Sequence, residues 1–123
     1  MTRTKLGIGL VGCGAIGSLL ARKVDSGTVG DIELIAVHDI ILERAERLAE
    51  SLRAKPEVAR TLDELLSIPE IELILEAGSQ AALRECAVKV LKAGKNLMAM
   101  SVGAFVDPQL MKQFQTTLKK TGG

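Results

Sequence analysis

The chain has 123 residues, a length that suits one domain built around one hydrophobic core. Charged residues make up 25% of the sequence, the formal net charge is +1, and the chain has two Phe and no Tyr or Trp. These values argue against nucleic acid and anionic membranes as partners, because there is neither a strong positive field nor a set of aromatic rings for stacking bases.

Metal and redox chemistry also find little support in the composition. The two cysteines, Cys13 and Cys86, lack the spacing of a zinc site, and the single histidine adds no third ligand, so we expect no metal site. Arg3 and Lys5 precede an apolar run, as in a secretion signal, but glycines interrupt that run and it is too short to span a bilayer, which takes about 20 residues. We therefore expect a cytoplasmic protein whose thiols are reduced rather than joined in a disulfide.

Short aliphatic and β-branched runs alternate along the chain with stretches of helical periodicity. The pattern predicts strands at 5–11, 32–38, 57–59, 71–76 and 96–100. It predicts helices at about 15–24, 41–53, 61–68, 79–93 and 108–118. Strands that alternate with helices imply right-handed β-α-β units, so we expect an α/β fold in which helices cover both faces of a doubly wound parallel sheet. We find no linker or internal repeat, and 1–123 is expected to be a single domain.

Side chains typical of helix ends support these boundaries. Thr61 and Glu64 have the spacing of a capping box, Ser79 suits an N-cap, and Gly94 suits a helix stop. The helical spacing of apolar residues predicts which side chains face the sheet. They are Ile16, Leu19, Leu20 and Val24 in the first helix, Ile41, Ala45, Leu48, Ala49 and Leu52 in the second, and Leu83, Ala87, Val90 and Leu91 in the 79–93 helix.

The sequence Gly12-x-Gly14-x-x-Gly17 lies where the first strand passes into the first helix. In that context the glycines allow a tight turn, a close approach of the backbone to a pyrophosphate, and close packing of helix on strand. The free amides at the start of the helix would then face the diphosphate. Strand, glycines and helix together predict a dinucleotide-binding domain with a Rossmann-type fold.

An acidic residue follows the second strand at the position that such a site requires. Asp39 lies 22 residues after Gly17, where a carboxylate accepts hydrogen bonds from the hydroxyls of the adenosine ribose. A 2'-phosphate would meet this negative charge, so Asp39 favours NAD over NADP, although NADP remains possible. Arg44 and Arg47 in the next helix could soften the preference, or they could simply belong to a solvated helix face.

Two further loops leave the same edge of the predicted sheet, at 77–80 and 101–104. Both consist mostly of small residues, which would let a nicotinamide ribose lie across them. Composition alone does not distinguish this role from that of ordinary strand-to-helix turns.

Four segments resemble the nucleotide-binding half of the L-aspartate dehydrogenase family, and more distantly that of homoserine dehydrogenase. They are LVGCGAIG at 10–17, VHD at 37–39, EAGS at 76–79 and MSVGA at 100–104. The resemblance implies oxidative deamination of L-aspartate to iminoaspartate, with hydride transfer to NAD(P), in a route that often feeds NAD biosynthesis. The cofactor-binding residues that the motifs and the resemblance indicate are Gly12, Cys13, Gly14, Ala15, Ile16, Asp39, Gly78, Ser79, Ser101, Val102 and Gly103.

The resemblance also implies a sixth strand and a second, catalytic domain after this segment, which would hold the substrate pocket, the catalytic histidine and most dimer contacts. We expect no catalytic residue in these 123 residues, because His38 precedes the ribose acid at the adenosine end of the site. The chain alone should bind nucleotide with little turnover, and its last strand, as a sheet edge, should promote self-association. The alternatives are a stand-alone nucleotide-binding or sensor module, a homoserine dehydrogenase-like fragment, and a domain that binds S-adenosylmethionine.

Overall fold

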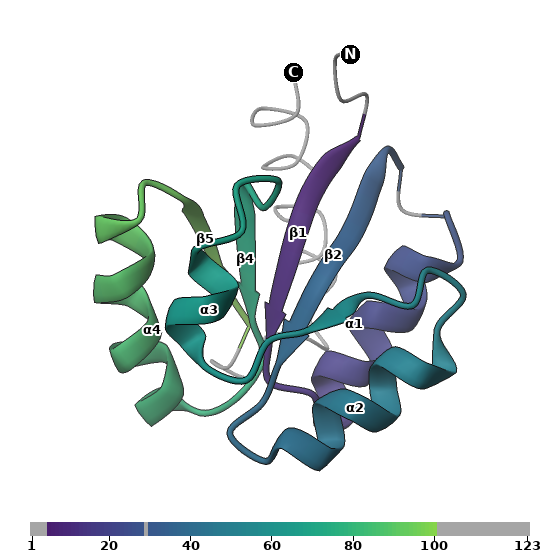
Figure 1. The fold of residues 1–123 in the computed structure, drawn as a ribbon, viewed down its shortest axis with the longest axis horizontal. Helices are drawn as coiled ribbons and strands as arrows, with labels where there is room; N and C mark the ends of the chain where they lie inside the picture. Colours follow the sequence, from purple (N-terminus) through teal and green to yellow (C-terminus); the bar gives the residue numbers. More distant parts are fainter. Residues whose placement is uncertain (1–4, 29, 101–123) are drawn as a thin grey trace.

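The computed structural model describes residues 5–28 and 30–100. In chain order the elements are β1 (Leu6–Val11), α1 (Ala15–Asp25), β2 (Ile32–His38), α2 (Leu42–Ser51), β3 (Glu57–Val58), α3 (Leu62–Leu66), β4 (Leu73–Glu76), α4 (Gln80–Lys92) and β5 (Asn96–Ala99). The strands form one parallel sheet in the order β3-β2-β1-β4-β5 (Figure 1). The expected doubly wound α/β fold is confirmed.

The strand order creates a switch point beside the central strand. From β1 the chain first moves outward through β2 to β3, and then returns to build β4 and β5 on the other side of β1. The loops that follow β1 and β4 therefore lead to opposite faces of the sheet. In open parallel sheets, ligands bind outside the carboxyl ends of the strands at such a point.

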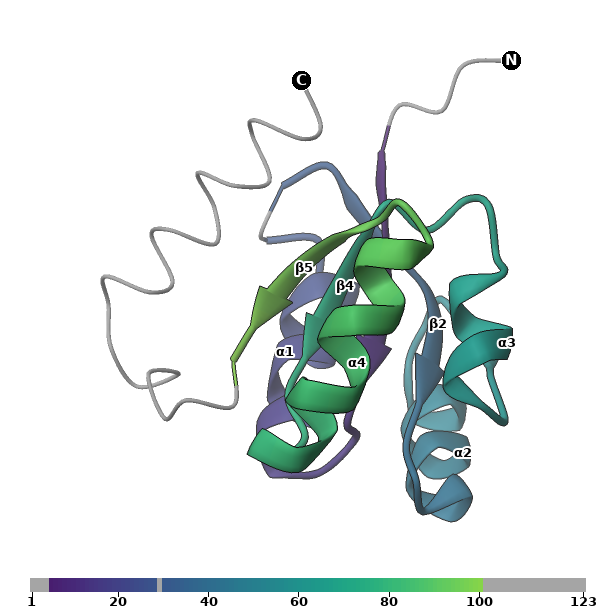
Figure 2. The same cartoon turned by 90° about the vertical axis from the view of Figure 1, so that its left-hand side faces the viewer.

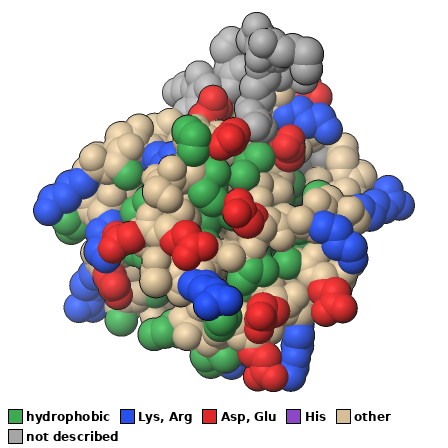
Figure 3. Space-filling model, in the orientation of Figure 1, with side chains coloured by type: hydrophobic (Ala, Val, Ile, Leu, Met, Phe, Trp, Pro, Cys, Tyr) green, Lys and Arg blue, Asp and Glu red, His purple; other side chains and the backbone are tan. Residues whose placement is uncertain are grey.

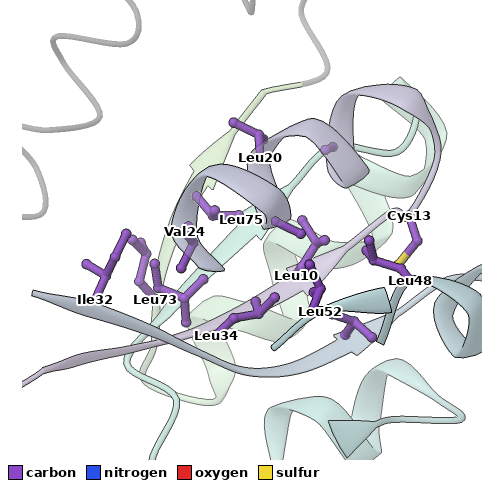
Figure 4. Packing of buried hydrophobic residues seen from close by; sticks show 14 of the residues in the cluster. Leu10, Cys13, Leu20, Val24, Ile32, Leu34, Leu48, Leu52, Leu73 and Leu75 are labelled. Atoms are coloured by element: carbon purple, nitrogen blue, oxygen red, sulfur yellow. The ribbon is translucent and has the colours of Figure 1, made fainter. Parts of the chain in front are cut away.

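Two apolar clusters hold the helices on the two faces. The cluster that packs α1 and α2 against the sheet includes Leu10, Leu20, Leu48 and Leu73 (Figure 4). The cluster under α3 and α4 includes Leu65, Ile74, Cys86 and Val90. Figure 2 shows α1 and α4 on opposite sides of β4 and β5. Alternation along β4 explains the division, because successive side chains of a strand point to opposite faces.

The predicted N-caps at Thr61 and Ser79 and the predicted helix stop at Gly94 are confirmed. The Thr61 side chain accepts a hydrogen bond from the Glu64 amide at 3.0 Å, and the Ser79 hydroxyl accepts one from the Ala82 amide at 3.1 Å. Gly94, just after α4, has φ 73°, a conformation that favours glycine. The ends of the strands shift by up to two residues, since β4 begins at Leu73 rather than 71 and β5 ends at Ala99 rather than 100.

Three of the side chains predicted to face the sheet do not. Leu19 is 54% exposed and Leu91 is 74% exposed, while Ile41 at the start of α2 is also exposed. On α4 the buried stripe runs through Cys86 and Val90, so Leu91 lies about 100° further round the helix. Smaller residues face the sheet where the pattern predicted large apolar ones. They are Gly17 and Ala21 on α1 and a buried cysteine on α4. The helix expected at 108–118 lies outside the described residues.

The face of the molecule that Figure 3 shows has side chains of both charges, and they are interspersed. No helix within 5–28 or 30–100 is long and apolar enough to cross a membrane. The same ranges contain no group of three or more His, Cys, Asp or Glu side chains placed to hold a metal ion.

Candidate functional site

The loop after β1 packs directly against the turn after β4. Gly12 has φ 99°, and a Cβ at this position would lie 2.6 Å from the Gly78 nitrogen. A Cβ on Gly17 would lie 1.8 Å from the Gly12 carbonyl oxygen. Side chains at either position are excluded by the protein itself, so these two glycines are required for the fold of the loop.

Gly14 is different from its two neighbours in the motif. It has φ −78° and ψ −156°, an extended conformation open to any residue, and a Cβ here would meet no atom within 4 Å. Neither backbone strain nor packing within the described residues therefore demands glycine. The motif also needs one glycine where a pyrophosphate approaches the backbone and a side chain would be in the way. The open space beside Gly14 fits this function.

The start of α1 is open to an anion. Gly14 is its N-cap, so no side chain caps the helix, and its first turn contains no acidic residue. The first amides of a helix carry partial positive charge, which favours a phosphate group at that end. The hydroxyl of Ser18 donates to the Cys13 carbonyl at 3.1 Å and ties the loop to the helix that follows it.

Asp39 lies at the end of β2 and is only 6% exposed. Its Oδ2 accepts a hydrogen bond from the Cys13 amide at 2.7 Å, and its Oδ1 accepts one from the Ile41 amide at 2.7 Å. The carboxylate thus joins the glycine loop to the turn that begins α2, a structural role that the sequence analysis missed. Each carboxylate oxygen can accept a second hydrogen bond, so a ribose hydroxyl can still bind.

Glu76, the last residue of β4, is a second buried acid at this edge. It is fully buried, and its Oε2 accepts a hydrogen bond from the Gly78 amide at 2.7 Å. Because Gly78 contacts Gly12, this bond holds the turn after β4 in place against the glycine loop. The other oxygen, Oε1, has no hydrogen-bond partner among residues 5–28 and 30–100. In the sequence, Glu76 stands out only as the first residue of the EAGS segment at 76–79.

A cleft of about 680 Å³ crosses the carboxyl ends of β1, β2 and β4. This volume lies within the usual range for small-molecule sites. Of the predicted cofactor-binding residues, the cleft is lined by Gly12, Gly14, Asp39, Gly78 and Ser79. The lining residues that the sequence analysis did not select include Ile40, Thr61, Asp63, Glu85 and Lys89. Ile40 is 95% exposed, an apolar side chain available to cover the flat face of a ring.

A second hollow, of about 470 Å³, adjoins the cleft on the side of α1 and α2. We call it the arginine hollow, because Arg22, Arg44 and Arg47 line it together with Cys13, Gly14, Ala15, Ser18, Leu48 and Ser51. It shares Gly14 and Arg44 with the cleft.

The other predicted residues lie elsewhere. Ile16 lines neither space and packs, half-buried, against the core under α1. Ser101, Val102 and Gly103 lie outside the described residues. The place of Thr61 and Asp63 at the cleft depends on the two-residue strand β3 that precedes them. The signal for this strand in the sequence is weak, so it did not indicate these two residues.

The two cysteines are held as unreactive thiols. Burial, with a smaller contribution from Asp39, raises the pKa of the Cys13 thiol to about 12. Burial, followed by the charges of Glu76 and Glu85, raises the pKa of Cys86 to about 11. Neither cysteine is a nucleophile at neutral pH, since the thiolate is the reactive form. His38 Nδ1 lies 2.9 Å from the Ala59 carbonyl, which fixes its ring at the β2 end of the cleft.

Comparison with known proteins agrees with this geometry. The model of the family described as "Homoserine dehydrogenase, NAD binding domain" matches residues 12–123. The chain is 39% identical over 115 residues to an L-aspartate dehydrogenase of Methanococcus maripaludis, covering 94% of this chain and 42% of the relative. It is 37% identical over 117 residues to an L-aspartate dehydrogenase of Methanocaldococcus jannaschii, covering 95% and 43%. The chain thus spans about two fifths of the length of these relatives.

A solved structure supports the fold independently. The myo-inositol dehydrogenase of Lactobacillus casei, in complex with NAD(H) and myo-inositol, superimposes with a TM-score of 0.72 at 23% identity, covering 77% of this chain and 28% of that one. At this identity the likeness establishes the fold alone, a Rossmann-type sheet. Together with the glycine loop, the space at Gly14 and the match over 12–123, it leads to one conclusion: the chain belongs to the family of NAD-binding domains described for homoserine dehydrogenase.

Proposed function

We propose that this chain is the NAD(P)-binding part of an L-aspartate dehydrogenase, which converts L-aspartate to iminoaspartate with hydride transfer to the cofactor. The relatives named L-aspartate dehydrogenase, at 37% and 39% identity across nearly the whole chain, carry this proposal. The iminoaspartate would feed NAD biosynthesis.

The described residues have distinct parts in binding. The amides that begin α1, next to the open space at Gly14, bind the diphosphate. Asp39 accepts hydrogen bonds from the adenosine ribose while it keeps the glycine loop in place. The exposed side chain of Ile40 covers the adenine, and Gly78 and Ser79 form the wall that leads toward the nicotinamide. The cofactor supplies the hydride acceptor, and the chain supplies its orientation.

We assign the binding and oxidation of the substrate to the part of the relatives that this chain does not cover. His38, the histidine that lines the cleft, is fixed by Ala59 beside Asp39 at the end of β2. We propose that the chain by itself binds the cofactor and does not oxidise aspartate.

Titration of the chain with NADH, followed by the fluorescence of the reduced nicotinamide, tests the binding half of the proposal. A saturable signal is expected, together with no increase in absorbance at 340 nm when aspartate and NAD are added. The product of the whole gene should produce that increase with L-aspartate and not with L-homoserine or L-glutamate. Oxidation of homoserine instead would support a homoserine dehydrogenase, the activity in the family's description. Binding without any oxidation by the whole gene product would favour a nucleotide-binding module.

The location and the partners of the chain are further parts of the proposal. The free thiols of Cys13 and Cys86 are both buried, which suits a cytoplasmic protein. We also propose self-association, because β5 is the last strand in the sheet order of the described residues and Val88 and Leu91 are exposed on the adjoining helix α4. Sedimentation velocity over a micromolar range tests this, and a single monomer boundary at all concentrations would contradict it. Nucleic acid and membranes are not proposed as partners.

A further inference from the structure

Glu76 places a carboxylate inside the protein, directly behind the wall of the cleft. Its side chain is fully buried, and its Oε2 accepts a hydrogen bond from the Gly78 amide at 2.7 Å. Gly78 lines the cleft, and a Cβ at this position would lie 3.5 Å from the same carboxylate oxygen. A single turn of backbone therefore separates the carboxylate from a ligand in the cleft.

The surroundings of Glu76 compensate its charge only in part. Within the described part of the chain, Oε1 has no hydrogen-bond partner, whereas both oxygens of Asp39 accept hydrogen bonds from backbone amides. Because Glu76 is fully buried, water screens its charge little. Burial is the main cause of the raised pKa of Cys86, about 11, and the charge of Glu76 is the next cause. The field of Glu76 thus reaches beyond the atoms that it contacts.

The strand order decides which half of a dinucleotide lies near Glu76. β1 lies between β2 and β4, and in the proposed function the amides that begin α1 bind the diphosphate (Figure 1). Asp39, just after β2, binds the adenosine ribose, so the other half of the dinucleotide extends from β1 across β4. Glu76 is the last residue of β4 and pairs with Val11, the last residue of β1. The nicotinamide half therefore lies on the side of the cleft that Glu76 supports.

A nicotinamide ring changes its charge when it is reduced. The ring of NAD⁺ is positively charged, whereas the ring of NADH is neutral, so a buried negative charge nearby attracts the first and has little effect on the second. Asp63 and Glu85 also line the cleft, but both are exposed, and Asp63 forms an ion pair with Lys89 at 3.2 Å. Water and the paired lysine weaken the fields of these two acids.

We propose that Glu76 makes the site discriminate between the two oxidation states of the cofactor, because the field of its buried carboxylate favours the oxidised form. This inference rests on the proposed function, since it assumes that the cleft binds a nicotinamide dinucleotide. A contribution of about tenfold lowers the midpoint potential of the bound two-electron couple by about 30 mV. Glu76 thus favours the release of reduced cofactor and its replacement by the oxidised form, which suits an enzyme that oxidises its substrate.

The test compares ligands that differ in the charge of the nicotinamide ring. Isothermal titration calorimetry measures the Kd of NAD⁺, NADH and ADP-ribose, which has no nicotinamide ring, for the unchanged chain and for Glu76→Gln. Glutamine keeps an acceptor for the Gly78 amide but carries no charge. The variant should bind NAD⁺ about tenfold more weakly, an effect that two unit charges reach even about 12 Å apart at a dielectric constant of about 20. It should bind NADH and ADP-ribose within about twofold of the unchanged chain.

Two controls separate the charge of Glu76 from a structural effect. Glu72→Gln removes an exposed carboxylate just before the opposite end of β4, and it should leave all three affinities unchanged. Benzamide adenine dinucleotide has a carbon atom in place of the charged ring nitrogen of NAD⁺, and the unchanged chain should bind it about tenfold more weakly than NAD⁺. This second comparison needs no variant, so it tests the inference even if Glu76→Gln does not fold.

The outcomes distinguish this inference from the proposed function. Equal losses of affinity for NAD⁺ and NADH in Glu76→Gln, or no loss for either, would overturn the role of the charge. Equal affinities of the unchanged chain for NAD⁺ and benzamide adenine dinucleotide would also overturn it. Saturable cofactor binding in these cases leaves the proposed function intact, whereas failure of NAD⁺, NADH and ADP-ribose to bind the unchanged chain would overturn the proposed function itself.

Discussion

Gly14→Val is the sharpest test of how the glycine loop works, because the structure predicts that it separates folding from binding. The backbone at Gly14 is extended, and a Cβ would meet no atom of the described residues within 4 Å, so the Cβ of a valine fits here without a clash. Valine is a poorer N-cap than glycine by about 0.5–1 kcal/mol. Loss of glycine from the unfolded chain restores about 0.4–1 kcal/mol. The free energy of unfolding should therefore change by less than about 1 kcal/mol.

Binding should respond very differently to the same change. The valine side chain would occupy the space through which a diphosphate approaches the first amides of α1. Each hydrogen bond to a charged group is worth about 1.5–3 kcal/mol, so losing two of them costs at least about 3 kcal/mol, or roughly 100-fold in Kd. NADH titration measures the affinity, and urea unfolding of the same sample measures the stability.

A control that places the same side chain elsewhere makes the result for Gly14→Val decisive. Ala93→Val also introduces a valine, at an exposed position at the end of α4 that does not line the cleft, and should leave NADH binding unchanged. If Gly14→Val binds NADH as tightly as the unchanged chain, the diphosphate does not lie where the loop predicts. Unfolding of Gly14→Val would contradict the open space at this position.

Three more predictions follow from the loop and its neighbours. Gly17→Ala should lower the free energy of unfolding by at least about 2 kcal/mol in urea, because the new Cβ would lie 1.8 Å from the Gly12 oxygen, and an unchanged midpoint would contradict that packing. Asp39→Ala should lower the free energy of unfolding by about 2 kcal/mol, because two buried amides lose their acceptors. Asp39→Asn should lower it by less, because one acceptor remains. Equal losses in the two variants would argue against the two hydrogen bonds. The folded pKa values of Cys13 and Cys86, about 12 and about 11, lie above the ordinary 9.0, so the unfolded chain loses these protons first. The stability that the two thiols provide is therefore present below pH 9 and declines as the pH rises from 9 toward 12. Urea unfolding at pH 8 and at pH 10 should show this decrease in the free energy of unfolding. The double variant Cys13→Ala/Cys86→Ala should show no such decrease.

Much of the candidate site could be predicted because its chemistry is local. The three glycines, the acid after the second strand and the caps at Thr61 and Ser79 each depend on a few neighbouring residues. The structure brings the predicted Gly12, Gly14, Asp39, Gly78 and Ser79 together along one cleft. Periodicity also located every strand and helix that the structure describes, since alternation and helical spacing are properties of short segments.

The sequence by itself determined that strands and helices alternate, that the first turn is built for close approach of backbone to a ligand, and that an acid follows the second strand. Only the tertiary structure decided that the loops after β1 and β4 touch, that Asp39 and Glu76 are engaged by backbone amides, and that Arg22 and Arg44 share a hollow. The exposure of Leu91 also belongs to this second group. The physical reason is the same in each case. Local patterns depend on neighbours in the chain, whereas burial and contact depend on the strand order β3-β2-β1-β4-β5, which brings together residues far apart in sequence.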